Sequence, residues 1–193
     1  MRLENLTGAD LSDAIEDIAR LRIAVFRDWP YLYDGDLEYE RRYLQSYELS
    51  DAAIVIGVYD GDWLVGASTG APLADHAGDF QEAFESSGID LKTTYYCGES
   101  VLLPRYRGRG IGQEFFDRRE AYARGLGYRN ICFCAVIRPP DHPLRPSQYR
   151  PLEGFWEGRG YARLPGVVAH FSWKDVDQAG ETVKPLQFWL RSL

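Results

Sequence analysis

Hydrophobic residues near the N-terminus recur at the spacing of an amphipathic helix. They fall at Ala14, Ile15, Ile18, Leu21 and Val25. Only Arg22 departs from this pattern. Thr7 and Asp10 have the spacing of a capping box, so we expect this first element to begin near them and to end before Pro30.

An aromatic and acidic segment follows at residues 27–36, where Pro30 and Gly35 indicate a loop. A second helix is expected after this loop because apolar residues again return at helical spacing. Its apolar stripe consists of Leu37, Tyr43, Leu44 and Tyr47.

The hydrophobic period then changes from that of a helix to that of a strand. Residues 53–59 and 63–67 flank Asp60-Gly61-Asp62, which predicts a β-hairpin with an Asp-Gly turn. Residues 74–92 are expected to form a loop that contains a short helix around residues 80–84.

A strand–helix–strand unit is predicted in the middle of the chain. Residues 95–103 have the pattern of a strand that stops at Pro104, and a helix is expected over residues 112–126, with Gly127 as its C-terminal cap. Residues 131–137 form a continuous apolar run, as in a strand that is buried on both faces. Such a βαβ unit has a right-handed crossover in nearly all proteins.

The C-terminal part begins with a proline-rich loop over residues 138–151. A short helix is expected at 152–159, and two strands at 167–173 and 185–190. Helices and strands thus alternate along the chain, which indicates an α/β fold with a mixed sheet. The length and the lack of a long linker favour a single domain over residues 1–193.

The charge balance limits the class of partner. The chain has 22 Lys and Arg against 29 Asp and Glu, which gives a net charge of −7. General nucleic-acid binding requires many cations to neutralise phosphates, so an acidic chain is a poor candidate for it. A cationic or neutral partner fits better, although a net charge also serves solubility.

Three cysteines, Cys97, Cys132 and Cys134, lie in apolar surroundings. Their odd number and their spacing favour neither a disulfide framework nor a metal site, and we expect buried free thiols. No segment approaches the about 18 apolar residues of a membrane span, and the first residues lack the apolar core of a signal peptide. We therefore expect a cytoplasmic protein without a membrane partner.

The segment with the clearest chemistry is the turn at residues 104–112. Glycines at positions 108, 110 and 112 let the backbone N–H groups point in one direction, and the helix that follows adds a partial positive charge. Arg105, Arg107 and Arg109 add three cations to an otherwise acidic chain. The combination predicts a binding site for a pyrophosphate.

Other glycine-rich motifs fit this turn less well. A P-loop requires a lysine that is absent here, and a dinucleotide fingerprint requires a glycine where Gln113 or Phe115 stands. An RNA-binding Arg/Gly tract would be longer. A tight structural turn with surface arginines remains an alternative.

Residues 107–112 match the Arg/Gln-x-x-Gly-x-Gly/Ala signature of the GNAT superfamily of acyl-CoA-dependent N-acyltransferases, and the chain resembles that family over about residues 95–165. The similar segments around the signature are 99–104, 121–128, 131–137 and 155–161. The resemblance implies one domain with a twisted mixed sheet of six or seven strands flanked by helices. The fourth and fifth strands of that sheet would splay apart.

The resemblance also implies acetyl-CoA as cosubstrate, without a metal. Its pantetheine arm would lie between the splayed strands and pair with the backbone of Val101, Leu102 and Leu103. A backbone N–H near Leu102 would stabilise the oxyanion of the tetrahedral intermediate. The pyrophosphate would bind the N–H groups of Arg107, Gly108, Arg109, Gly110, Ile111 and Gly112.

Glu99 is the candidate general base, because it is a carboxylate in a largely apolar strand and the family often has a catalytic Glu there. A structural ion pair is its alternative role. The position of the family's usual acidic Tyr holds Trp156, which cannot donate a proton at useful pH. Tyr149 is the candidate acid, with packing or solvent protonation of the thiolate as alternatives. His142 lies in the same loop, where Asp141 offers it an ordinary partner.

The loop at residues 27–36 lies where the family often builds its acceptor pocket. Trp29, Tyr31 and Tyr33 could bind a cation through their rings, and Asp34 and Asp36 through their charges. Ordinary packing of this loop is the alternative.

Together these features predict an N-acetyltransferase in which a primary amine of a small molecule or peptide attacks acetyl-CoA directly. The alternative is a non-catalytic acyl-CoA-binding or regulatory module on the same fold, which the replacement by Trp156 favours. No nucleic-acid partner is expected, and a homodimer is compatible with the family. The acceptor pocket lies in the least diagnostic part of the chain, so the sequence does not name the amine.

Overall fold

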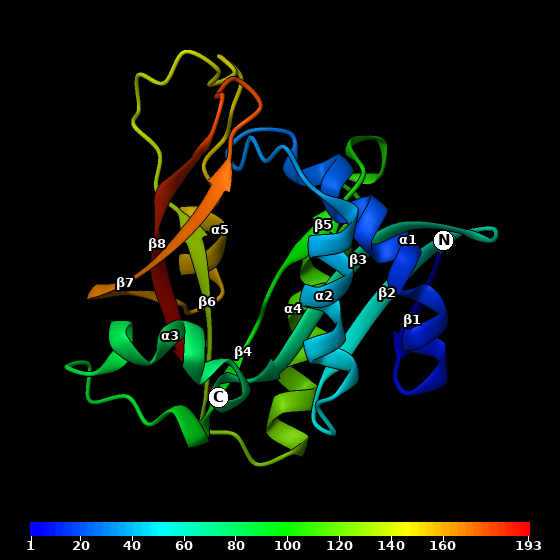
Figure 1. The fold of residues 1–193 in the computed structure, drawn as a ribbon. Coiled ribbons are helices and arrows are strands. Elements are labelled where there is room, and N and C mark those ends of the chain that lie inside the picture. The colour runs from blue at the N-terminus through cyan, green and yellow to red at the C-terminus, as the bar shows by residue number, and fades with distance from the viewer.

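A mixed β-sheet with helices on both faces organises the chain in the computed structural model, which describes residues 1–193 (Figure 1). The strands are β1 (Arg2–Leu6), β2 (Ile54–Asp60), β3 (Trp63–Pro72), β4 (Thr94–Tyr96), β5 (Ser100–Leu102), β6 (Asn130–Val136), β7 (Ala162–Lys174) and β8 (Glu181–Ser192). The α-helices are α1 (Ala9–Phe26), α2 (Leu37–Glu48), α3 (Ala77–Phe84), α4 (Ile111–Gly125) and α5 (Glu153–Gly158). Short 3-10 turns cover Leu73–His76, Leu91–Thr93 and Pro104–Tyr106.

The strands follow the order β1-β2-β3-β4-β6-β8-β7, and β5 also pairs with β3. Only β4 and β6 are parallel, and all other pairs are antiparallel. The mixed α/β fold of the sequence analysis is therefore confirmed. The sheet has one more strand than the upper expectation, partly because one predicted strand is divided into β4 and β5.

The division of that strand makes the two halves of the sheet diverge. β4 pairs with β6 through Thr94–Tyr96, whereas β5 pairs only with β3. Figure 1 shows β5 leaning away from β6 above β4, so the sheet opens like a V. The expected splay between these strands is therefore present in the structure.

The break occurs at Cys97-Gly98-Glu99, and Gly98 explains why the chain tolerates it. A Cβ atom at Gly98 would collide with the hydroxyl groups of Tyr47 and Thr69. The close approach therefore requires glycine, and an isolated glycine in a strand often marks such an irregularity.

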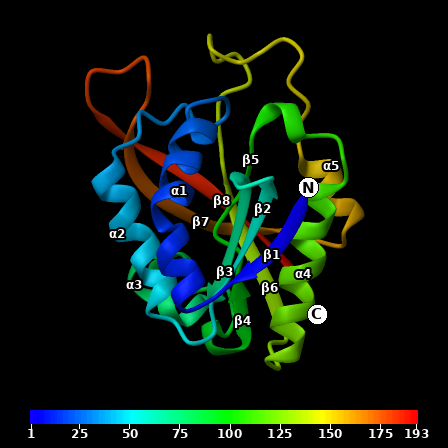
Figure 2. The same ribbon diagram turned by 90° about the vertical axis from the view of Figure 1, so that its right-hand side faces the viewer.

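Separate hydrophobic clusters cover the two faces of the sheet. α1 and α2 pack on one face with Ile18, Leu44 and Val101, and α4 packs on the other with Phe115. Figure 2 shows α1 and α2 on one side of the sheet and α4 on the opposite side. A third cluster lies under α3 and includes Phe188. No helix has the length and apolar composition needed to cross a bilayer.

The predicted helices, the hairpin and the last two strands are confirmed, with ends that shift by a few residues. The first element is a correction. A strand, β1, precedes α1, and its polar residues hide the alternation of a strand. The predicted capping box is also wrong, because Gly8 rather than Thr7 is the N-cap and no side chain caps the helix.

The three cysteines are buried free thiols, as predicted. Burial raises the pKa of Cys97 to about 11 and that of Cys134 to about 12. Both thiols are therefore protonated near neutral pH and are poor nucleophiles.

Candidate active site

The opening of the V begins where β4 and β6 separate. The N–H of Cys97 donates to the carbonyl of Cys132 at 2.8 Å, and beyond this point β5 bonds to β3 instead. The N–H of Leu103 donates to Val65 on β3 at 3.0 Å. Because peptide groups alternate along a strand, those of Ser100 and Leu102 face the opening.

This alternation separates the three backbone positions predicted to bind pantetheine. Leu102 faces the opening with its peptide group, and its carbonyl already accepts from Nε of Arg107 at 3.1 Å. Val101 pairs with Ala67 of β3, and the N–H of Leu103 is bonded to the same strand. Of the three, Leu102 has the backbone N–H that is free for a ligand.

The predicted anion-binding turn lies just above, between β5 and α4. Gly108 and Gly110 have φ values of 75° and 81°, a region that side chains other than glycine rarely adopt. None of the backbone N–H groups from Gly108 to Gly112 donates to a carbonyl in the chain. A Cβ at position 112 would meet open space, so no protein atom explains that glycine.

Three exposed arginines surround this turn, and none of them has a carboxylate within ion-pair distance. Arg105 and Arg109 both lie over the ring of Tyr106, at 4.8 and 5.6 Å from its centroid. Tyr106 is itself held by a 2.7 Å hydrogen bond to Asp60. The turn therefore combines free N–H donors with unpaired cations, which suits a phosphate group.

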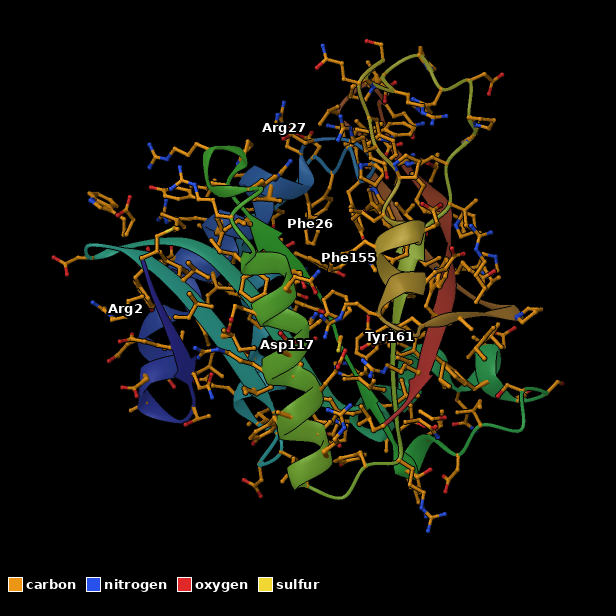
Figure 3. All side chains as sticks on the ribbon, turned by 180° about the vertical axis from the view of Figure 1, so that it is seen from behind. Arg2, Phe26, Arg27, Asp117, Phe155 and Tyr161 are labelled. Atoms are coloured by element: carbon orange, nitrogen blue, oxygen red, sulfur yellow. The ribbon has the colours of Figure 1, made fainter.

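A polar cavity of about 640 Å³ adjoins the turn between α4 and α5. Gln113, Asp117 and Arg159 are among its lining residues. Figure 3 shows Asp117 on α4 and Phe155 on α5, and the ring of Phe155 packs against that of Phe116 on α4 at 5.5 Å.

Glu99 lies at the break in the strand, and its side chain points to the face covered by α1 and α2. It is buried, with Oε1 at 2.5 Å from Arg22 and Oε2 at 3.1 Å from the hydroxyl of Tyr43. Arg22 also pairs with the fully buried Glu40. One guanidinium therefore serves two carboxylates, and this buried cluster carries a net charge of about −1.

Tyr43 extends the cluster. Its hydroxyl lies 2.9 Å from that of Tyr47, and its ring lies 4.2 Å from the guanidinium carbon of Arg22. Burial, followed by the charge of Glu99, raises the pKa of Tyr43 well above its usual value. Tyr43 is therefore a hydrogen-bond donor to the carboxylate and not a source of protons.

The three aromatic residues of the predicted acceptor loop are placed apart. Trp29 packs against the ring of His142 at 5.2 Å and of Tyr149 at 5.9 Å. Tyr31 packs against Phe26 on the inner side of the loop, and burial raises its pKa. Burial also raises the pKa of Tyr33, together with the charge of Glu40. Trp29 and Tyr31 border the V, and Tyr33 turns toward α2.

The two acidic residues of the same loop have structural partners. Asp36 is the N-cap of α2 and accepts from the N–H of Tyr39 at 2.8 Å. Asp34 pairs with Arg27 at 3.0 Å and with Lys174 at 2.8 Å. Two cations therefore neutralise Asp34, whereas Asp36 uses one carboxylate oxygen as a helix cap and stays exposed.

Tyr149 and His142 lie in the long loop after β6, which extends beyond the ends of β7 and β8 (Figure 1). Burial raises the pKa of Tyr149, which makes its phenol a weaker acid. Nδ1 of His142 accepts from the N–H of Leu144 at 3.2 Å, so the expected pairing with Asp141 is not formed. Trp156 packs against Phe133 at 4.9 Å, as a core residue.

A buried cation–carboxylate cluster connects the acceptor loop to the other half of the sheet. Arg138 pairs with both oxygens of the fully buried Asp175, at 2.7 and 2.9 Å, and donates to the carbonyls of Pro30 and Tyr31. Lys184 also approaches Asp175, at 3.4 Å. Residues 27–36 therefore form a strap across the mouth of the V.

Sequence reasoning missed Arg22, Glu40 and Arg138, whose partners are distant along the chain. Arg22 did give a signal, as the one polar residue on the apolar stripe of α1. A cation at such a position implies a buried counter-charge, but the stripe alone does not say which carboxylate supplies it.

The comparisons with known proteins agree with this geometry. The model of the acetyltransferase (GNAT) family matches residues 18–146, which is well over half of the chain. That match begins within α1 and includes the strap, the V and the turn at residues 107–112. No curated protein matches the sequence.

Solved structures with little sequence identity share the fold. An aminoglycoside 6'-N-acetyltransferase complexed with coenzyme A has a TM-score of 0.61 at 16% identity, covering 100% of this chain and 97% of its own. A ribosomal-protein-alanine N-acetyltransferase from Brucella melitensis has a TM-score of 0.60 at 12% sequence identity, and the match covers 100% of both chains. A Salmonella typhimurium protein assigned as an acetyltransferase was solved with its cofactor acetyl-CoA. It has a TM-score of 0.59 at 14% sequence identity, and the match covers 100% of this chain and 95% of its own. With a family match over most of the chain and the same fold throughout, this protein belongs to the GNAT family of acetyltransferases.

Proposed function

We propose that this protein transfers an acetyl group from acetyl-CoA to a primary amine by direct attack of the amine on the thioester. The observation that carries the proposal is the turn at residues 107–112, where free backbone N–H groups, unpaired arginines and the start of α4 converge. A neighbour in fold was solved with acetyl-CoA and another with coenzyme A, which supports the choice of cosubstrate.

The residues present fit acetyl-CoA. The N–H groups of Gly108, Arg109, Gly110, Ile111 and Gly112 would bind the pyrophosphate, and the open space at Gly112 lets it approach the backbone. The N–H of Arg107, predicted to join them, already donates to the carbonyl of Pro104 at 3.1 Å, so Arg107 would contribute its side chain alone. The arm would enter the V, where the peptide group of Leu102 faces it. The adjoining residues Val101 and Leu103 would hold β5 in place through their bonds to β3.

Glu99 would take the proton that the amine must lose. Arg22 pairs with both Glu99 and Glu40, so two carboxylates share one guanidinium. This arrangement would attract the ammonium form of an amine toward Glu99. The N–H of Leu102 would donate to the oxyanion as the amine attacks.

The acceptor would approach from the face covered by α1 and α2. Trp29 and Tyr31 border the V on this side and offer ring faces to a cation, whereas Tyr33 would act from the α2 side. A small amine or a peptide amine fits this description. Neighbours in fold are named for an aminoglycoside and for an alanine of a ribosomal protein, which are both amine acceptors.

The proposal is tested by thiol release from acetyl-CoA in the presence of a library of small amines and peptides. We expect release that depends on an amine, and we expect Glu99→Gln to lower it at least about a hundredfold with acetyl-CoA affinity retained. Glu48→Gln, which changes an exposed carboxylate on α2, is the matched control. Acetyl-CoA binding without release for any amine would instead indicate a non-catalytic module, and unchanged turnover of Glu99→Gln would exclude Glu99 as the base.

A further inference from the structure

A buried guanidinium without a carboxylate lies at the apex of the V. Arg119 of α4 is only 1% exposed. Its hydrogen bonds go to neutral groups: the carbonyls of Thr69 and Glu99, at 3.2 and 2.9 Å, and Oγ of Ser100, at 2.9 Å. Every other largely buried arginine named above has a carboxylate partner. A buried cation normally requires a counter-charge, so its absence here is unusual.

Glu99 and Ser100, two of the three residues that accept hydrogen bonds from Arg119, have side chains on opposite faces of the sheet. Glu99 points toward α1 and α2, where it meets Arg22. Ser100 points toward α4, where its hydroxyl meets Arg119. The carboxylate of Glu99 therefore lies on the face of the sheet covered by α1 and α2. The hydroxyl of Ser100 and the cation of Arg119 lie on the opposite face, covered by α4, which follows the turn at 107–112.

Ser100 is well placed to meet a ligand. It is exposed, although Arg119 beside it is buried, and it lies on β5 where no strand pairs on the side of β6. An N–H of Arg119 donates to the Ser100 oxygen, so the Ser100 hydroxyl acts as a donor. In the structure its acceptor is Oγ of Ser68, whose own proton goes to the carbonyl of Glu99 at 3.0 Å, and a ligand sulfur would replace Ser68 as the acceptor. The nearby Ser68 hydroxyl is 3.3 Å away, longer than an ordinary O–H···O bond.

The positive charge of Arg119 favours a thiolate in its vicinity. The Cys97 thiol shows this effect: burial raises its pKa, and the charge of Arg119 partly offsets that rise. A sulfur anion placed nearer, against Ser100, would experience the same field together with a direct hydrogen bond.

We propose that Ser100 and Arg119 form the site that stabilises the thiolate of coenzyme A as it leaves. Ser100 would donate its hydroxyl proton in a hydrogen bond to the sulfur, and Arg119 would orient that hydroxyl and supply the positive charge. This inference rests on the proposed function and assigns a group to the leaving side of the reaction. Trp156 cannot act there as an acid, and Tyr149 is made a weaker acid by burial.

The step balances without an additional reactant. The amine nitrogen forms a bond to the acetyl carbon, the carbon–sulfur bond breaks, and its electron pair goes to sulfur. The amine proton goes to Glu99. Ser100 keeps its proton while it stabilises the thiolate, which takes its own proton from solvent after release.

The test does not require the acceptor. The thiol of bound coenzyme A is titrated by the ultraviolet absorbance of its thiolate, with the complex of desulfo-coenzyme A as the blank. In the wild-type protein we expect the pKa of the bound thiol to lie at least about one pH unit below that of free coenzyme A. Arg119→Met and Ser100→Ala should each move it back toward the free value, with coenzyme affinity measured at low pH changed less than about twofold.

Two matched variants sharpen the outcome. Arg118→Met removes the neighbouring cation of α4, which bonds to the carbonyl of Leu3, and should leave the pKa of the bound thiol unchanged. Tyr149→Phe should also leave it unchanged, and a rise in that variant alone would assign the role to Tyr149 and overturn the inference. An equal thiol pKa in the wild type, Ser100→Ala and Arg119→Met would overturn it as well.

Failure of this inference is distinct from failure of the proposed function. If coenzyme A does not bind the wild-type protein in calorimetry, both are wrong. If it binds and its thiol titrates as in free solution, only the role of Ser100 and Arg119 is wrong. If Arg119→Met does not fold, the exposed Ser100→Ala change still decides the result.

Discussion

Single residues in this protein act through the environment that the fold gives them. Arg22 and Arg119 are both buried arginines, yet one neutralises carboxylates and the other meets only neutral acceptors. Glu99 and Ser100 are adjacent in the sequence, yet they face opposite sides of the sheet. The role of an arginine or a carboxylate here therefore depends on the groups that surround its side chain as well as on the residue type.

His76 provides a prediction at this scale. It is buried among Tyr47, Phe80 and Tyr96, and burial lowers its pKa from 6.5. The unfolded chain then binds more protons than the folded one below about pH 6.5, so stability falls as the pH falls through the window from that value to the folded pKa. His76→Phe should reduce this loss of stability below pH 6.5, measured by urea unfolding at several pH values.

The matched control is His170→Gln, which changes an exposed histidine on β7. Its stability should follow the wild-type pH dependence. If the wild-type protein and His76→Phe had parallel curves, burial of His76 would not contribute to the acid sensitivity.

At the scale of elements, the start of α4 is the part that the sequence predicted best. Alternating glycines and the following helical pattern are local signals, and the structure has the turn and the helix as expected. The break between β4 and β5 was not predicted, because it depends on contact of Gly98 with Tyr47 and Thr69, which are distant in sequence. The orientation of the Ser100 and Leu102 peptide groups toward the V results from that break.

Gly112→Glu tests the start of α4 as an anion site. A carboxylate in the first turn of a helix is favourable for the helix, so the free energy of unfolding should stay the same or rise by up to about 1 kcal/mol. The same carboxylate would repel a phosphate, so acetyl-CoA affinity should fall at least about tenfold in calorimetry. Gly125→Glu, at the other end of α4, should keep the affinity. Equal affinities in all three proteins would place the coenzyme elsewhere.

For the whole molecule, the α/β class and most elements could be predicted from hydrophobic periodicity. The connections across the V could not, because they depend on contacts between distant segments. Arg138 and Asp175 are far apart in the sequence, where each looks like an ordinary surface charge. In the structure both side chains are buried, and they hold the strap to β7 and β8. The position of the strap is therefore a property of the tertiary structure.

Asp175→Asn tests the strap. The change leaves Arg138 and Lys184 without their buried carboxylate, so the free energy of unfolding should fall by about 3 kcal/mol. The amide of Val176, which donates to Leu32 at 2.7 Å, should exchange faster with solvent. Asp177→Asn, an exposed neighbour, should change neither quantity. A stable variant with unchanged exchange would show that the cluster does not hold the strap.

The most direct measurement for the whole account is calorimetric titration of the wild-type protein with acetyl-CoA, together with the Gly112→Glu variant. We expect the wild-type protein to bind one acetyl-CoA per chain, with binding weakened at least about tenfold by Gly112→Glu. NAD and ATP, which lack the pantetheine arm, should bind far more weakly. If the folded wild-type protein does not bind acetyl-CoA in this titration, the proposed function is wrong.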